Sequence, residues 1–248
     1  MAVNTPSPAA ARPTPAARPR PGVRDAEYWR NLRYLAFGRA LPAVLFGFMG
    51  WLQFQRLEST LPAANLRHTV EQVMPRALYL LFCAVPVVIY LTRPRPKRSD
   101  TRLLPRVIAF VATTMQLFVG AFAPDSPQLF NPPAWVADVS GILLLLSFAF
   151  ALWGLAYLRR SLSIVPEARR LTTGGPYRLV RHPLYCGEFL AAVSIVLPNM
   201  KLISIASVLC LLALQLARTV YEEALLRDVF PEYADYARRT ARVIPGVI

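Results

Sequence analysis

Polar side chains that could take part in chemistry crowd into a short stretch at the edge of an apolar run. His182 and Glu188 both lie in the sequence GGPYRLVRHPLYCGEFLAAVSIVLP, which begins at Gly174. A bilayer penalises ionisable groups inside an apolar segment, so such groups usually face a partner or a polar cavity. Pro183 suits the first position of a helix and pushes the residue before it out of helical geometry. We therefore expect a helix to begin near Pro183, with His182 in the loop that precedes it.

Tyr185 and Glu188 are three residues apart in the first two turns of this expected helix, so they share one face. Free backbone N–H groups at such a helix start favour a negative group nearby. The simpler alternative is that Arg181 and Glu188 form only an ion pair at the membrane interface. The stretch alone leaves both interpretations open.

A second polar cluster lies in RTVYEEALLRDVFPEYADYARR, from Arg218 to Arg239. Arg218 and Glu222 are four residues apart, so on a helix one lies above the other. Taken alone, this segment fits a solvated helix held by ion pairs. The two clusters together indicate more, because a helical hairpin brings the start of its first arm next to the end of its second. We therefore expect 182–188 and 218–223 to line one cavity at the cytoplasmic interface.

The elements that position these clusters are apolar helices. A fifth apolar block, 184–217, is too long for one span, and Pro198 and Asn199 interrupt it, so we expect a tight hairpin. We predict an all-α integral membrane helical bundle with about six transmembrane helices, including this C-terminal hairpin. The four earlier blocks have about the 20 residues that a membrane-spanning helix needs, and they are Tyr34–Phe54, Met74–Thr92, Leu104–Ala123 and Trp135–Leu158.

The distribution of charge also favours a membrane protein. The chain is 55% hydrophobic and 17% charged, whereas soluble domains carry about 25% charged residues. A net charge of +14 would suit a nucleic-acid-binding protein, but Lys and Arg alternate along the chain: six in 93–106, none in 124–134 and six in 159–181. This alternation follows the positive-inside rule and predicts that both termini are cytoplasmic. Basic loops beside anionic lipid head groups need no nucleic-acid partner.

We divide the chain into three parts. Residues 1–27 are rich in Pro, Ala and Arg, and this composition predicts a disordered cytoplasmic tail. Residues 28–158 form the expected four-span membrane scaffold, and residues 159–248 the expected catalytic region, with the hairpin and a cytoplasmic C-terminal segment. We predict no metal site, because the two histidines, His68 and His182, are far apart in the sequence and the three cysteines are scattered through apolar segments.

Three motifs resemble the isoprenylcysteine carboxyl methyltransferase family of integral membrane enzymes. They are Gly-x-Pro-Tyr at 174–177, Arg-His-Pro-x-Tyr at 181–185 and Arg-x-x-x-Glu-Glu at 218–223. The resemblance covers residues 161–245, about a third of the chain. The first four apolar blocks resemble the family only in being apolar segments of membrane-spanning length. It implies a bacterial-type member that uses S-adenosylmethionine as methyl donor. With 26 arginines and two lysines, the chain is typical of a GC-rich bacterium, so we expect the inner membrane and a site that faces the cytoplasm.

The resemblance also implies roles for residues of the two clusters. Glu222 would hold the charged methionine moiety of the cofactor, and Leu171 and Thr172 would contact the cofactor through their backbone. The full implied cofactor set is Leu171, Thr172, Tyr177, His182, Tyr185 and Glu222.

The implied catalytic residues are Arg218, which would face the methyl acceptor, and Glu223. A carboxylate acceptor needs no general base, whereas a hydroxyl, amine or thiol would need one, and then Glu223 or Glu188 is the candidate. Arg181 and Glu188 are further possible site residues. We expect a lipophilic acceptor, most simply an isoprenylcysteine-like or other prenyl or lipid acid.

Three other functions stay open at this point. One is methylation of a phospholipid amine or a small thiol by the same kind of site. A second is an NADPH-dependent sterol-type membrane reductase, whose Arg-His-Pro-Asn-Tyr stretch would differ here only at Leu184. A third is a non-enzymatic membrane scaffold. The sequence does not determine the oligomeric state.

Overall fold

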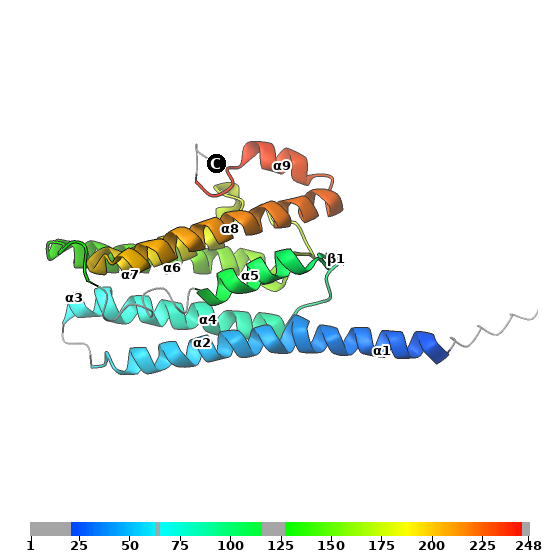
Figure 1. The fold of residues 1–248 in the computed structure, drawn as a ribbon, viewed down its shortest axis with the longest axis horizontal. Coiled ribbons are helices and arrows are strands. Elements are labelled where there is room, and N and C mark those ends of the chain that lie inside the picture. Colours follow the sequence, from blue (N-terminus) through cyan, green and yellow to red (C-terminus); the bar gives the residue numbers. More distant parts are fainter. Residues whose placement is uncertain (1–20, 63–64, 116–126, 245–248) are drawn as a thin grey trace, which may run out of the picture.

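The computed structural model describes residues 21–62, 65–115 and 127–244. These residues form a helical bundle with one short strand pair, in which β1 (Arg98–Ser99) runs antiparallel to β2 (Glu167–Ala168) (Figure 1). The main helices are α1 (Pro21–Leu35), α2 (Leu41–Glu58), α4 (Met74–Thr92), α5 (Leu103–Met115), α6 (Trp135–Leu158), α7 (Pro183–Val196), α8 (Leu202–Val229) and α9 (Tyr233–Arg239). Single turns of π-helix join α1 to α2 and the short α3 (Leu66–His68) to α4.

Four of the described helical segments are long and apolar enough to cross a membrane: Glu27–Glu58, Leu66–Thr92, Trp135–Ser161 and Leu202–Val229. They indicate an integral membrane protein and confirm the prediction of an all-α membrane bundle. Two further apolar helices, Leu103–Met115 and Pro183–Asn199, are shorter. The count of six spans therefore stays a prediction, and the end of the predicted third span, 116–123, lies outside the described residues.

The helices pack in pairs, and α2, α4, α6 and α7 share one cluster of buried apolar side chains. α4 packs against α2 on one side and α6 on another, α6 packs against α7, and α5 packs against α8. Large apolar side chains remain on the outside, among them Val44, Trp51 and Phe54 of α2. Such an apolar exterior is expected where lipid, rather than water, surrounds a helix.

The predicted hairpin is present, and its two ends fall where the sequence places them. α7 begins at Pro183, with His182 as its N-cap residue at φ −127° and ψ 62°. A turn at Leu197–Asn199 separates α7 from α8. On the far side of this turn, Leu129 donates its backbone N–H to Met200 at 2.9 Å, so the loop before α6 meets the hairpin turn. Both segments would lie on the outer side if both termini are cytoplasmic, as the alternation of Lys and Arg predicts.

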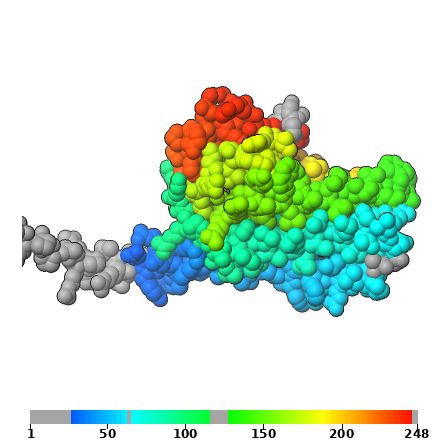
Figure 2. Space-filling model, turned by 180° about the vertical axis from the view of Figure 1, so that it is seen from behind, coloured from blue at the N-terminus to red at the C-terminus, as the bar shows by residue number. Residues whose placement is uncertain are grey.

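The C-terminal segment folds back over the loop that precedes α7. The backbone N–H groups of Arg181 and His182 donate to the carbonyls of Ala241 and Arg242, at 2.8 and 3.2 Å. Figure 2 shows the red C-terminal part lying on the yellow-green loop. Of the expected N-terminal tail, residues 1–20 lie outside the described residues. Residues 21–27 form the start of α1 instead of tail, and Pro21 suits a first helical position.

Candidate functional site

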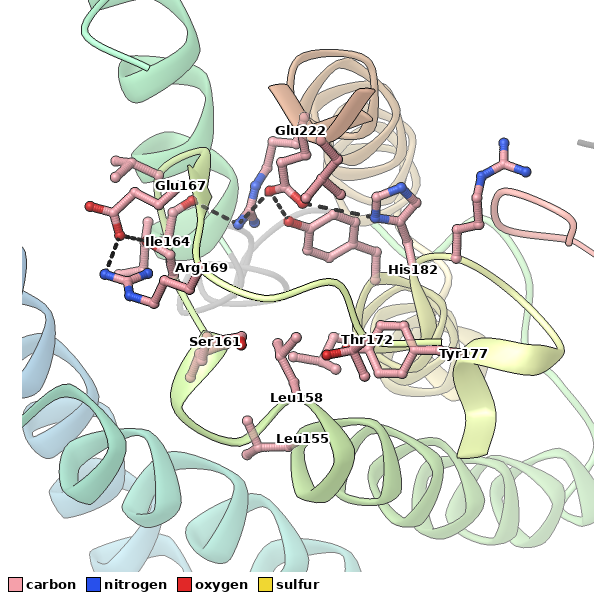
Figure 3. Close-up of a pocket in the computed structure, with 18 of the residues that line it drawn as sticks. Leu155, Leu158, Ser161, Ile164, Glu167, Arg169, Thr172, Tyr177, His182 and Glu222 are labelled. Atoms are coloured by element: carbon pink, nitrogen blue, oxygen red, sulfur yellow. Dashed lines mark hydrogen bonds and ion pairs between the residues drawn. The ribbon is translucent and has the colours of Figure 1, made fainter. Parts of the chain in front are cut away.

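A cavity lies where the loop 161–172, the start of α7 and the second half of α8 meet (Figure 3). It contains about 1130 Å³ of empty space, part of it open to solvent. Its wall is mixed: Leu155 and Leu158 of α6 are apolar, whereas Tyr177, His182 and Glu222 present polar groups. Such a cavity suits a ligand with both a polar and an apolar part.

A tight turn shapes the loop beside this cavity. Gly175 has φ +59°, in the left-handed region, and a Cβ atom there would lie 2.6 Å from the ring of Tyr157. Only glycine combines that backbone conformation with that close approach. The turn leads into Pro176 and Tyr177, both buried. Burial raises the pKa of Tyr177 well above its usual value, so its phenol group stays protonated and neutral.

The predicted cofactor residues His182, Tyr185 and Glu222 are brought together across the two arms of the hairpin. The rings of His182 and Tyr185 stack at 5.4 Å between centroids, with an angle of 4° between their planes. The hydroxyl of Tyr185 donates to Oε1 of Glu222, and Nδ1 of His182 lies 3.8 Å from Oε2 of Glu222. Glu222 is therefore held from two sides with its carboxylate at the cavity wall.

The other predicted cofactor residues also line the cavity. Leu171 and Thr172 lie on the segment just before the tight turn, and Thr172 and Tyr177 face the cavity from the same side in Figure 3. Tyr236 of α9 donates its hydroxyl to the backbone carbonyl of Tyr177 at 2.7 Å. α9 thereby covers this side of the cavity.

Arg218 is buried, with 4% of its surface exposed, and it lies at the cavity wall. Its guanidinium carbon lies 4.5 Å from the ring centroid of Tyr185. Its Nη2 donates to the carbonyl of Ile164 at 3.0 Å and lies 3.9 Å from Oε1 of Glu222. Its Nη1 donates to Gln215 at 3.3 Å, and Gln215 in turn donates to Glu188 at 2.5 Å. Arg218 is thus fixed between the loop and the predicted cofactor residues.

Glu223 lies next to Glu222 in the sequence but does not line the cavity. Its side chain is fully buried and pairs with Arg181, Arg227 and Arg242 at 2.9, 2.8 and 3.1 Å. Nε2 of His182 lies 3.3 Å from its Oε1. The geometry therefore places Glu223 as the centre of an ion-pair network that joins α8, the loop and the C-terminal segment, and gives it no access to a ligand in the cavity.

Arg181 and Glu188, the two further candidates, both line the cavity. Arg181 reaches Glu223, and its Nη1 donates to the backbone carbonyls of Ala237 and Thr240. Arg181 pairs with Glu223, and Glu188 accepts a hydrogen bond from Gln215.

Sequence reasoning missed a buried charge cluster on the loop. Glu167 pairs with Arg169 at 2.8 Å and with Arg93 at 3.4 Å. Arg93, at the end of α4, also donates to the carbonyl of Leu162 at 2.7 Å. Beside it, the backbone N–H of Ile164 donates to the hydroxyl of Tyr90 at 2.6 Å. The described part of residues 28–158 therefore also positions the loop.

Comparison with known proteins finds a family match over part of this region. Residues 136–233 match the family model for phospholipid methyltransferase, which supports a membrane methyltransferase domain that uses S-adenosylmethionine. That range holds α6, α7, α8 and the loop between α6 and α7. The match does not distinguish isoprenylcysteine carboxyl methyltransferases from other membrane methyltransferases.

Two curated proteins are similar to part of the chain. It is 38% identical over 81 residues to the nickel-cobalt-cadmium resistance protein NccN of Alcaligenes xylosoxydans xylosoxydans, over 32% of this chain and 38% of that protein. It is 37% identical over 76 residues to the cobalt-zinc-cadmium resistance protein CzcN of Cupriavidus metallidurans, over 30% of this chain and 35% of that protein. The chain thus spans little more than a third of the length of these relatives. Among the residues that the structure describes, no group of three or more His, Cys, Asp or Glu side chains is placed to hold a metal ion.

Proposed function

We propose that residues 159–248 carry the active site of an S-adenosylmethionine-dependent methyltransferase, which methylates a lipophilic acceptor at the cytoplasmic face of a bacterial inner membrane. The observation that carries the proposal is the convergence of His182, Tyr185 and Glu222 on one cavity that also has an apolar wall. The six-span bundle with both termini in the cytoplasm is part of this proposal. It puts the cavity where a polar cofactor arrives from water and a lipid from the bilayer.

The residues at the cavity wall fit S-adenosylmethionine. Its ammonium and sulfonium groups are cationic, and Glu222 supplies a carboxylate that is held at the wall. The hydroxyl of Tyr233, at the same wall, is buried and has no partner among the described residues, so it is free to bind a ligand. Leu171 and Thr172 would contact the cofactor through their backbone. When bound, the cofactor supplies an already activated methyl group, so the protein mainly binds and orients.

The acceptor that fits best is a carboxylate on a prenyl or lipid chain, as in an isoprenylcysteine. Arg218 is fixed at the wall, and a guanidinium can orient a carboxylate through two parallel hydrogen bonds. Its Nε is buried without a partner among the described residues. No base is needed for a carboxylate. Glu223, one of the two acids that could serve as a base, is fully engaged with three arginines.

Methylation of a phospholipid amine is the second candidate, because the matching family model is described as phospholipid methyltransferase. An amine acceptor must lose a proton, and Glu188, one of the acids at the cavity wall, could receive it. A thiol acceptor would also have to lose a proton to a base. The reductase and scaffold alternatives gain no support from the match.

The proposal predicts that the detergent-solubilised protein binds S-adenosylmethionine and not NADPH. Equilibrium binding with radiolabelled S-adenosylmethionine and with NADPH separates methyltransferase, reductase and scaffold, because a scaffold binds neither. Methyl transfer is then measured for acceptors that share one head group and differ in chain length. We expect kcat/KM to rise with each prenyl or alkyl unit until the cavity is filled. A short, water-soluble acceptor that works as well as the longest one would contradict a lipophilic acceptor.

A further inference from the structure

The buried charge cluster of Arg93, Glu167 and Arg169 has two positive side chains and one negative side chain. The side chains of Arg93, Glu167 and Arg169 are 1%, 6% and 3% exposed. Two guanidinium groups therefore share a single carboxylate away from bulk water. A buried charge is costly unless it is paired. Within this cluster, one positive charge has no carboxylate of its own.

Arg169 and Glu167 both line the cavity, and Arg169 is the cation of this cluster that does so. Its Nη2 donates to Glu167 at 2.8 Å, and its Nε donates to the backbone carbonyl of Pro94 at 3.0 Å. Its Nη1 is buried and has no hydrogen-bond partner among the described residues. Two of its three nitrogens thus fix the side chain, and the third is left as a donor. Buried donors without a partner are rare because each costs the desolvation of the group.

The free donor is separate from the predicted cofactor residues. Figure 3 shows Arg169 and Glu167 on one side of the cavity and Thr172, Tyr177 and His182 on the other. Arg218, whose Nε is also without a partner among the described residues, donates to the carbonyl of Ile164 on the same loop. Arg169 therefore offers positive charge and an unused donor at the side of the cavity opposite Thr172, Tyr177 and His182.

We propose that Arg169 binds an oxyanion, a carboxylate or a phosphate, of the ligand in the cavity, with Glu167 as the positioning residue that orients it. The proposal deepens the proposed function, on which it rests, by assigning an acidic group to the ligand at this end. Such an oxyanion supplies the missing negative charge and accepts from Nη1. It has two possible sources: the carboxylate of S-adenosylmethionine or the acidic head of the acceptor.

The experiment compares acidic ligands with matched neutral ones for the full chain in detergent. One pair is S-adenosylmethionine and its decarboxylated form, and the other is N-acetyl-S-farnesylcysteine and its methyl ester, each measured by calorimetric titration. In Arg169→Gln we expect the affinity for the acidic member of one pair to fall by about tenfold or more, as for loss of a hydrogen bond to a charged group. The neutral member of that pair should bind as before, and the pair affected identifies the source.

Two variants separate this role from a general effect on folding or charge. Arg160→Gln removes an exposed arginine just after α6 that does not line the cavity, and it should leave all four affinities within about twofold, as expected for a screened surface charge. Arg169→Lys keeps a positive charge beside Glu167 but lacks the planar guanidinium fork, so it should stay close to the wild type in melting temperature while still losing part of the preference for the acidic ligand.

The proposal is overturned if Arg169→Gln weakens the acidic and neutral members of a pair equally, which would show a distorted cavity. It is also overturned if the wild type binds both members of each pair equally or binds neither. Failure of the proposed function looks different: the wild type would then not bind S-adenosylmethionine or its decarboxylated form, while the second pair still reports on Arg169.

Discussion

Nε2 of His182 lies 3.3 Å from Oε1 of Glu223, and Nδ1 of the same ring lies 3.8 Å from Oε2 of Glu222. One imidazole thus stands between two adjacent glutamates of α8, one inside the ion-pair network and one at the cavity wall. The ring connects the rigid part of the fold with the part that would touch a ligand. Substitutions at the three positions should therefore have separable effects.

For cofactor binding, His182→Ala and Glu222→Ala should each lower the affinity for S-adenosylmethionine. Glu222 is the carboxylate offered to the cofactor, and His182 helps to hold it. Calorimetric titration in detergent measures the change, with thermal unfolding to show that each variant is folded. Glu232→Gln, an exposed carboxylate at the start of α9, is the control. Unchanged affinity in both variants would refute this assignment.

For stability, Glu223→Gln should be the most damaging of these changes. It leaves three arginines without their shared carboxylate, and breaking a buried ion pair from one side costs about 3–5 kcal/mol. Arg238→Ala, which breaks the exposed pair with Asp235, should cost about 0–1 kcal/mol. Thermal unfolding measures both. Equal melting temperatures for the two variants would show that the network around Glu223 does not stabilise the fold.

For turnover, Arg218→Ala should abolish methyl transfer to a carboxylate acceptor and leave the affinity for S-adenosylmethionine within a few-fold. Arg218→Lys should rescue turnover poorly, because lysine cannot present a planar two-point fork. Steady-state kinetics measures the loss of turnover, and titration with S-adenosylmethionine measures the retained cofactor affinity. A lysine variant with wild-type kcat/KM would contradict the proposed two-point contact.

For the loop, Gly175→Ala should destabilise the protein by about 1–2 kcal/mol, the cost of a left-handed conformation with a side chain, with the contact to Tyr157 adding to it. Gly47→Ala is a matched control, because it lies on an exposed face of α2 with nothing within 4 Å of the added Cβ. There alanine should stabilise the helix by about 0.5–1 kcal/mol. Melting temperatures that shift in the same direction would contradict this assignment of the turn.

For topology, reporter fusions after Ile248 and within the loop 124–134 should report opposite compartments. The alternation of Lys and Arg predicts the cytoplasm for the first and the outer side for the second. A fusion near Lys201 should agree with the loop, because Leu129 and Met200 are hydrogen-bonded. If the two main fusions agree, the count of six spans is wrong.

The parts of the fold that the sequence predicts are those with local signals. Pro183 and the Pro198-Asn199 pair mark helix boundaries within a few residues of their own positions, and the structure confirms both. The convergence of His182 and Glu222 was also predictable, because a helical hairpin brings the start of its first helix next to the end of its second.

The parts that sequence reasoning could not find depend on contacts between distant segments. Arg93 and Glu167 are 74 positions apart, and nothing in either local sequence indicates that they pair. Similarly, the adjacent Glu222 and Glu223 look alike in the sequence. Which of them faces the cavity depends on the rotation of α8, and this is set by arginines from the loop and from the C-terminal segment.

The backbone bonds from Arg181 and His182 to residues 241 and 242 set an order for biogenesis. A nascent chain can insert its apolar helices one by one while it is being synthesised. The loop that carries His182 lacks these partners until the last segment has left the ribosome, because residues 241 and 242 are made some 60 positions later. Membrane insertion and completion of the site are therefore separate events in time, and a chain that is interrupted after α8 would be embedded in the membrane without a finished site.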